Sequence, residues 1–221
     1  MSNLVPATAT STSLVDWSQD PFEQIANTMA QTGTPLKFSK GKWYRGYGND
    51  ERPADGMTLI ADVQGIMVGW RCWKDRKIVD AAVGFVAENF KPPQRNDLGD
   101  LDESAWERDA NGNPKDPWVF GFYIRLTDDD GEAYVYSATS NGARRAVFDL
   151  IKEFTKRRKK DPAHCVPVVR LMADSYRHKD YGRIDTPKLA VIDWHDSGAA
   201  VASIPSPDGS DDVEMGDTIP F

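Results

Sequence analysis

Residues 118–160, WVFGFYIRLTDDDGEAYVYSATSNGARRAVFDLIKEFTKRRKK, decide the fold. Apolar and aromatic residues dominate 118–127, and they return in 132–139 around Tyr134 and Tyr136. Between the two segments stands Asp-Asp-Asp-Gly, which is typical of a hairpin turn. The sequence therefore predicts two antiparallel strands, 118–127 and 132–139.

A helix is predicted directly after this hairpin, over residues 142–160. Ser140 is a good N-cap, and Pro162 ends the helix. Basic residues at 157–160 suit the negative end of the helix dipole. The apolar positions fall on one helical face, and they are Ala143, Val147, Leu150, Ile151 and Phe154.

The remaining strands are predicted on both sides of this unit. Residues 58–73 indicate a long strand in which Gly65 or Gly69 marks a bulge or a bend. A turn at residues 75–76 leads to its antiparallel partner at 77–88. After the helix, strands are expected at 166–176 and 188–194, with a loop at 181–183 between them.

This order predicts a mainly β chain with one helix, an α+β fold. Strands, one helix and two further strands match an OB-fold-like barrel of five or six strands, although four strand candidates precede the helix where the minimal pattern has three. Other α+β folds share the order. Residues 89–117, rich in Pro, Asp, Asn and Gly, are a long loop insertion of a length that is usually functional or mobile.

The two ends of the chain differ from the body. Residues 1–35 form a predicted arm that is disordered over 1–20 and weakly helical over 21–31. Residues 36–195 form the single folded domain. Residues 196–221 hold six acids and no base among small residues and prolines, which predicts a disordered acidic tail.

The overall composition is that of a soluble globular protein, with 40% hydrophobic and 28% charged residues in a chain of 221. No apolar stretch reaches the roughly 18 residues of a membrane span, and the N-terminus lacks a secretory pattern. Two cysteines, Cys72 and Cys165, suit a reducing compartment. We therefore expect a cytoplasmic protein that does not bind membranes.

Charge is distributed unevenly along the chain, whose net charge is −7. Residues 36–96 hold 11 bases against 7 acids, and residues 114–195 hold 15 against 12. The negative charge is concentrated in the two ends and in residues 97–113. A mildly basic body with an acidic tail permits binding of nucleic acid without requiring it.

Motifs for catalysis are missing from the sequence. It contains no GxxxxGK[ST], GxSxG, HExxH or DxDxDG pattern. The Asp128-Asp129-Asp130 run is explained by turn chemistry. Neither a CxxC nor an HxxxH spacing accompanies His164 and Cys165. We expect no enzymatic activity, no metal and no cofactor.

Three segments combine cations with aromatic rings, which is the composition of single-strand binding surfaces. They lie in residues 37–48, in residues 70–77 and in the predicted 118–139 hairpin. The candidate DNA-binding residues are Lys40, Lys42, Trp43, Tyr44, Arg45 and Tyr47 in the first segment, Trp70, Arg71, Trp73 and Lys74 in the second, Tyr123, Arg125, Tyr134 and Tyr136 in the third, and Arg157 and Arg158 at the helix end.

Packing is the alternative role for several of these residues, because aromatic residues are favoured on strands in any case. Phe120 and Phe122 are expected in the core. For Tyr134 and Tyr136, stacking on DNA and packing are equally compatible with the sequence. Trp70 and Trp73 fall on opposite faces of a regular strand, so only one of them is expected to stack. The four basic residues at the helix end could be merely solvated.

The last residues, DDVEMGDTIPF at 211–221, form an acidic run that ends in Ile-Pro-Phe with a free carboxylate. This tip resembles that of bacterial single-stranded DNA-binding proteins. The resemblance implies that Ile219, Pro220 and Phe221 anchor partner proteins and that Asp217 and the other acids meet a basic rim around the partner's pocket. Thr218 stands where the common pattern has another acid, and Gly216 dilutes the run.

The resemblance covers only the tip, and residues 36–195 do not align with the family domain. It implies an OB domain that binds single-stranded DNA in replication, recombination or repair and recruits processing enzymes. Many members of the family form tetramers, so a homo-oligomer is possible. A divergent form from a phage or mobile element would act in the bacterial cytoplasm, at the nucleoid or in an infected host. The alternative is an adaptor that docks on such enzymes through the tip without binding DNA.

Overall fold

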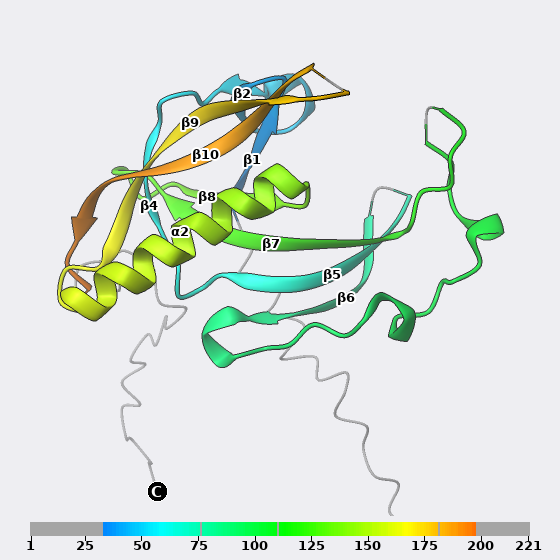
Figure 1. Ribbon diagram of the computed structural model, residues 1–221, viewed down its shortest axis with the longest axis horizontal. Coiled ribbons are helices and arrows are strands. Elements are labelled where there is room, and N and C mark those ends of the chain that lie inside the picture. The colour runs from blue at the N-terminus through cyan, green and yellow to red at the C-terminus, as the bar shows by residue number, and fades with distance from the viewer. Residues whose placement is uncertain (1–32, 76, 110, 181, 198–221) are drawn as a thin grey trace, which may run out of the picture.

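The computed structural model describes residues 33–197, apart from residues 76, 110 and 181 (Figure 1). The described part is mainly β with one helix, as the sequence predicts. Its strands and helix are β1 Thr34–Ser39, β2 Lys42–Arg45, β3 Arg52–Pro53, β4 Thr58–Ala61, β5 Met67–Lys74, β6 Lys77–Phe85, β7 Trp118–Thr127, β8 Ala133–Ala138, α2 Asn141–Lys160, β9 Val166–His178 and β10 Gly182–His195. Residues 1–32 of the predicted arm and 198–221 of the predicted tail lie outside the described residues, and β1 begins at Thr34, inside the predicted arm.

The β7–β8 hairpin and α2 lie where the sequence predicts them. In the turn, the Asp128 carboxylate accepts hydrogen bonds from the backbone N–H groups of Asp130 and Glu132. The Ser140 hydroxyl caps α2 by accepting from the N–H of Ala143 at 3.2 Å. These local contacts explain why a short-range sequence signal is enough for this unit.

The strands form one sheet with the order β10-β9-β4-β7-β8-β1-β2-β3, and β5 extends it by pairing with both β7 and β6. β1 runs parallel to β8, and the other pairs are antiparallel. The ten-stranded sheet is larger than the predicted five or six strands. The difference is mainly β1, β2 and β3. β1 and β2 overlap residues 37–48, which were interpreted from sequence as a binding segment, and β3 follows that segment.

The predicted long strand over 58–73 is divided into β4 and β5. The carboxylate of Asp62 accepts from the N–H of Gly65 at 2.8 Å, and this turn lets the chain bend while both halves stay paired with β7. Gly65 therefore marks the bend that the sequence left open between two glycines. The predicted loop at 181–183 is wrong for residues 182 and 183, because β10 already begins at Gly182 and pairs with β9 along its length.

The core lies between the sheet and α2. Val147, Leu150 and Phe154 of the helix pack against strand residues of which Ile124 and Leu126 are fully buried. The ring of Trp43 is also fully buried, and its Nε1 donates to the carbonyl of Met172 at 2.7 Å. This bond ties β2 to β9 across the core.

The long loop between β6 and β7 is fixed by one arginine. Arg95 donates from Nε and Nη2 to the two carboxylate oxygens of Asp116, each at 2.7 Å. It also donates to the carbonyls of Gly99 and Asp100. Since bidentate pairs of this kind are among the strongest side-chain contacts, Arg95 holds the loop at residues 99–100 and at Asp116 together.

Candidate nucleic-acid interface

Five neighbouring strands share one face outside the core. Side chains alternate along a strand, and paired residues share a face. The register therefore places four residues on this face, namely Tyr44 of β2, Lys37 of β1, Arg125 of β7 and Arg71 of β5. Tyr44 and Lys37 are paired with each other. The opposite face of the same strands carries the core. We call the first face the outer face of β5-β7-β8-β1-β2.

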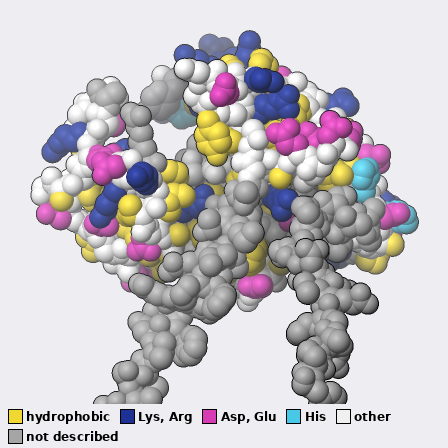
Figure 2. Space-filling view, turned by 180° about the vertical axis from the view of Figure 1, so that it is seen from behind, with side chains coloured by type: hydrophobic (Ala, Val, Ile, Leu, Met, Phe, Trp, Pro, Cys, Tyr) yellow, Lys and Arg dark blue, Asp and Glu magenta, His cyan; other side chains and the backbone are white. Residues whose placement is uncertain are grey.

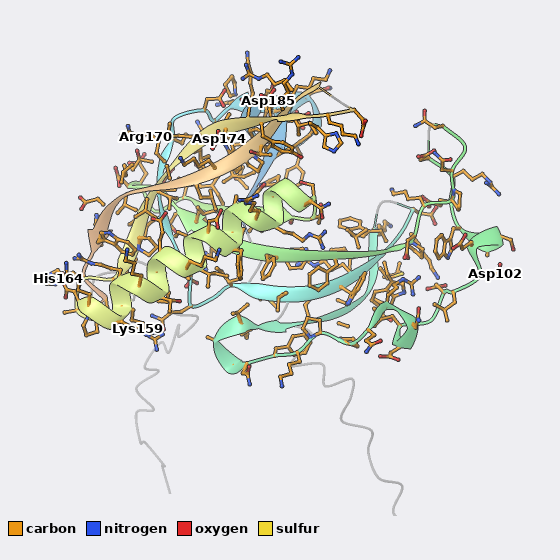
Figure 3. All side chains as sticks on the ribbon, in the orientation of Figure 1. Asp102, Lys159, His164, Arg170, Asp174 and Asp185 are labelled. Carbon is orange, nitrogen blue, oxygen red and sulfur yellow. The ribbon has the colours of Figure 1, made fainter. Side chains whose placement is uncertain are left out.

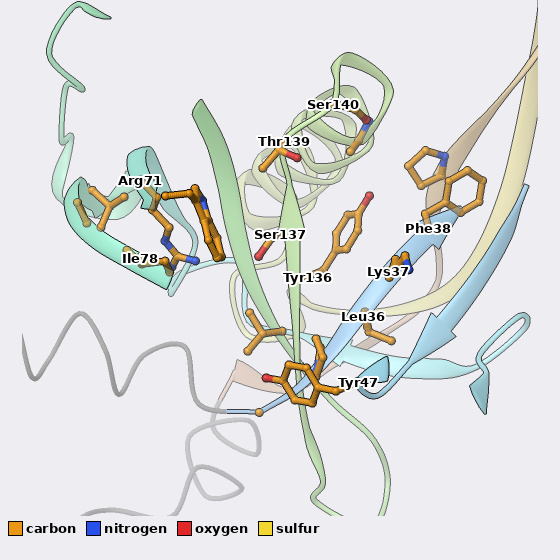
Figure 4. Close-up of a pocket in the computed structure, with 18 of the residues that line it drawn as sticks. Leu36, Lys37, Phe38, Tyr47, Arg71, Ile78, Tyr136, Ser137, Thr139 and Ser140 are labelled. Atoms are coloured by element: carbon orange, nitrogen blue, oxygen red, sulfur yellow. The ribbon is translucent and has the colours of Figure 1, made fainter. Parts of the chain in front are cut away.

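A groove of roughly 950 Å³ runs along this outer face and also reaches Leu36, Phe38 and Tyr136, which belong to the inner face, and Ala143 of α2. Figure 4 shows Arg71 and Ile78 on one side, Lys37 and Phe38 on the other, and Ser137 between them on β8. Tyr47 lies at one end, and Thr139 and Ser140 lie at the other. The groove therefore follows β8 and has polar, cationic and apolar groups along its length.

Residues that are far apart in the sequence meet at this groove. Tyr47 comes from the first predicted segment, whereas Arg71 and Trp73 come from the second. The Tyr47 and Trp73 side chains are 72% and 38% exposed, so their rings are accessible for stacking. Tyr136 of the third segment also borders the groove, but it is only 3% exposed.

Arg71 has an unusual environment for a cation. It is 6% exposed, and its Cζ lies 3.6 Å from the centroid of the Tyr123 ring. Gly69 and Gly121 face each other between the two side chains. The φ of Gly69 is +144°, and a Cβ there would collide with the carbonyl of Ala82. Gly69 thus lets the backbone of β6 approach closely, and Gly121 leaves room beside the Tyr123 hydroxyl.

Burial dominates the protonation equilibria of this pair. Desolvation lowers the pKa of the Arg71 guanidinium, although the Tyr123 phenol acts in the opposite sense. Desolvation also raises the pKa of the Tyr123 hydroxyl. An arginine stays charged even so, and a neutral phenol remains a hydrogen-bond donor. At neutral pH the pair therefore presents a cation and an O–H donor.

Further cations gather at one edge of the molecule. Lys40 and Lys42 are exposed around the β1–β2 turn, and Arg177, Lys179 and Arg183 are exposed at the tip of the β9–β10 hairpin. Figure 2 shows Lys and Arg side chains along the upper edge, which in Figure 1 carries β2 and this hairpin. This edge provides positive charge beyond the groove itself.

Three predicted stacking residues lie in the core instead. Trp43 and Tyr134 are fully buried, and Tyr136 is 3% exposed. The Tyr134 hydroxyl donates to Asp128 and accepts from Arg45, and burial with the Asp128 contact raises the pKa of Tyr134 to about 12. Alternation forces these rings inward once the strand register is set, so they are not available to stack on bases.

Tyr123 and Trp70 also differ from simple exposed rings. Tyr123 is on the outer face, as expected from the inward placement of Phe120 and Phe122, but only 3% of it is exposed. Phe120 and Phe122 are half-buried on the inner face. Trp70 lies beside Phe120 with its Nε1 donating to the carbonyl of Pro93, so Trp70 anchors the long loop while Trp73 borders the groove.

Several predicted cations are engaged elsewhere. Lys74 pairs with Asp100 at 3.1 Å. Arg157 pairs with Asp161 and donates to the carbonyl of His164. Arg158 is exposed beside Phe154. Figure 3 shows this end of α2, marked by Lys159 and His164, at the far end of the helix from Ser140. The helix-end cations are therefore remote from the groove.

Sequence reasoning missed three parts of this surface. Lys37 is the first residue of the first cation-rich segment, but it was not predicted as a DNA-binding residue. It pairs with Glu51 at 3.0 Å. Ile78 and Val79 of β6 line the groove, although they were interpreted only as strand residues. The basic hairpin tip was missed because residues 182–183 were assigned to a loop. The short alternation Arg183-Ile184-Asp185 could have extended that strand.

The described residues contain no cluster of three or more His, Cys, Asp or Glu side chains arranged to hold a metal ion. Within the same part of the chain, no helix is both long and apolar enough to cross a bilayer. Comparisons with known protein families, curated proteins and solved structures gave no match. The site is therefore interpreted from its own geometry.

Proposed function

We propose that this chain is a sequence-tolerant, non-enzymatic single-stranded DNA-binding protein that protects single strands in replication, recombination or repair. The observation that carries the proposal is the convergence of Tyr47, Arg71 and Trp73 on one groove. Exposed rings stack on bases of any sequence, and cations neutralise phosphates. Both contributions are needed along an extended strand, and a groove that follows β8 can supply them together.

The topology supports an OB-like barrel as the scaffold. If β4 and β5 are counted as one bent strand, that strand, β7 and β8 precede α2, and β9 and β10 follow it. This is the order of an OB barrel, in which the face of strands 2 and 3 binds oligonucleotides. By this count β7 and β8 are strands 2 and 3, and the groove lies on their outer face. β1, β2, β3 and β6 are then additions.

A titration with oligo-dT tests DNA binding directly. The chain contains seven Trp residues, and Trp73 lies at the groove, so base stacking should quench tryptophan fluorescence. We expect quenching whose midpoint shifts to higher DNA concentration as salt is raised, with a log–log slope of about −0.7 per phosphate contact. An adaptor that only binds proteins would show no quenching, and that result would exclude the proposal.

We also propose that the tip, which lies outside the described residues, recruits processing enzymes. Deleting Phe221 should abolish co-elution with single-strand-processing enzymes of the host, because the deletion removes the terminal ring and shifts the carboxylate. Affinity for oligo-dT should change by less than about twofold, since the groove does not include residue 221. Unchanged co-elution of the Phe221 deletion would show that the tip is not the anchor. Thr218→Ala serves as the matched control and should retain co-elution.

A further inference from the structure

The outer face contains polar groups that the described structure leaves without hydrogen-bond partners. The hydroxyl of Tyr123 and the Nε of Arg125 are buried and have no partner. Two residues apart on β7, they share the face on which Arg71 lies. Buried hydrogen-bond donors nearly always have acceptors in folded proteins, so two buried donors without acceptors on one face require an explanation.

Arg71 adds an uncompensated charge to the same place. Among the described residues, no carboxylate lies within ion-pair distance of its guanidinium. Asp80 borders the groove, but it does not pair with Arg71. A buried charge without a counterion destabilises a fold, and such an arrangement persists where a ligand provides the opposite charge.

The surroundings of Arg71 indicate where that ligand binds. A Cβ built at Gly121 would lie 3.4 Å from the Tyr123 hydroxyl, so the Tyr123 ring extends back along β7 over Gly121. The Arg71 guanidinium lies against this ring and borders the groove. Ser137, which is paired with Tyr123 on β8, also lines the groove. Tyr123 itself does not line it, so Arg71 is the group of this pair that a ligand in the groove can reach.

We propose that Arg71, held against the Tyr123 ring, forms a partly desolvated binding site for one phosphodiester group of the bound single strand. This inference rests on the proposed function and adds to it a specific phosphate position. The guanidinium provides charge and N–H donors, and Tyr123 is a positioning residue behind it. Stacking on Tyr123 fixes the guanidinium plane, so that a flexible lysine would not reproduce its donor geometry.

The test compares oligo-dT affinity and thermal unfolding for wild type, Arg71→Gln, Arg71→Lys and Tyr123→Phe. Arg71→Gln should weaken binding by about 10- to 100-fold, as expected for losing hydrogen bonds to a charged group. Tyr123→Phe keeps the ring that positions the guanidinium, so it should change affinity by less than about threefold. Arg71→Gln should also reduce the salt slope by about 0.7. Arg71→Lys should keep the slope but recover only part of the affinity.

Unfolding separates this site from a structural role. The DNA-free Arg71→Gln and Tyr123→Phe proteins should unfold at or above the wild-type temperature, because the first change removes a buried charge that has no counterion among the described residues and the second removes a buried hydroxyl that has no hydrogen-bond partner there. Arg170→Gln is the matched control: Arg170 is exposed on β9, outside the groove (Figure 3), and its loss should change affinity by less than about threefold.

Two negative outcomes are distinguishable. If wild type binds oligo-dT and Arg71→Gln binds equally well with the same salt slope, the phosphate site is wrong while the proposed function stands. If the wild-type protein does not bind oligo-dT at all, both the phosphate site and the proposed function are excluded. Weaker binding by Arg71→Gln together with a lowered unfolding temperature would assign Arg71 to the fold, and would also overturn the site.

Discussion

Replacing Tyr47 and Trp73 together by alanine is expected to weaken oligo-dT binding by at least about 30-fold. Base stacking on one aromatic side chain contributes about 1–3 kcal/mol by alanine substitution, and these two exposed rings lie in the same groove from separate parts of the chain. The measurement is a fluorescence-anisotropy titration with labelled oligo-dT, because the variant loses one of the tryptophans that would report by quenching.

The control for this double variant is Phe148→Ala. Phe148 is 50% exposed on α2 and does not border the groove, so it is matched in exposure and aromatic character. Its removal should change affinity by less than about twofold. The salt slope of the double variant should stay that of wild type, since no cation is removed. Wild-type affinity in the double variant would mean that these rings do not contact DNA.

Trp43→Ala is expected to destabilise the fold by about 3–5 kcal/mol, a large fraction of the stability of an ordinary domain. The Trp43 ring is fully buried, packs against Phe38 and Tyr136 at centroid distances of 5.4 and 4.8 Å, and donates to Met172. Alanine leaves a cavity and an unpaired carbonyl on β9. Urea unfolding followed by circular dichroism measures the change.

Tyr47→Ala provides the contrast from the same segment of sequence. Tyr47 is 72% exposed, and its removal should change the free energy of unfolding by less than about 0.5 kcal/mol. The two variants thus separate a core aromatic from a surface aromatic four residues away. If Trp43→Ala unfolded at the same urea concentration as wild type, the buried placement of Trp43 would be contradicted.

The elements that the sequence predicted well are those with local causes. The β7–β8 hairpin and α2 are specified by turn residues, an N-cap and a helical apolar period, all within residues 118–160. The division of the 58–73 strand followed from one Asp62 contact that no period reveals. β1 and β2 were missed because glycines and cations interrupt the apolar pattern of residues 37–48, and because the parallel pairing of β1 with β8 is long-range.

The candidate site was predicted in composition but not in geometry. Cations and rings in the first two segments do line one groove, yet which rings face it depends on register. Trp43 and Tyr44 are neighbours of similar chemistry, and alternation places the first in the core and the second on the outer face. The burial of Arg71 could not be predicted, because it depends on the long-range pairing of β5 with β7, which brings Arg71 onto the Tyr123 ring.

The end of the described chain has a practical consequence. Ser197 donates from its backbone N–H to the carbonyl of Ala163 at 2.8 Å, and Asp196 contacts His164 at 2.7 Å, so the last described residues lie beside the C-terminal end of α2. Ser140 and Ala143, at the other end of the helix, border the groove. A helix of 20 residues is about 30 Å long. A dye, an affinity handle or a sensor surface coupled after residue 197 is therefore attached about one helix length from the groove, which allows immobilised protein to capture oligonucleotides without obstruction.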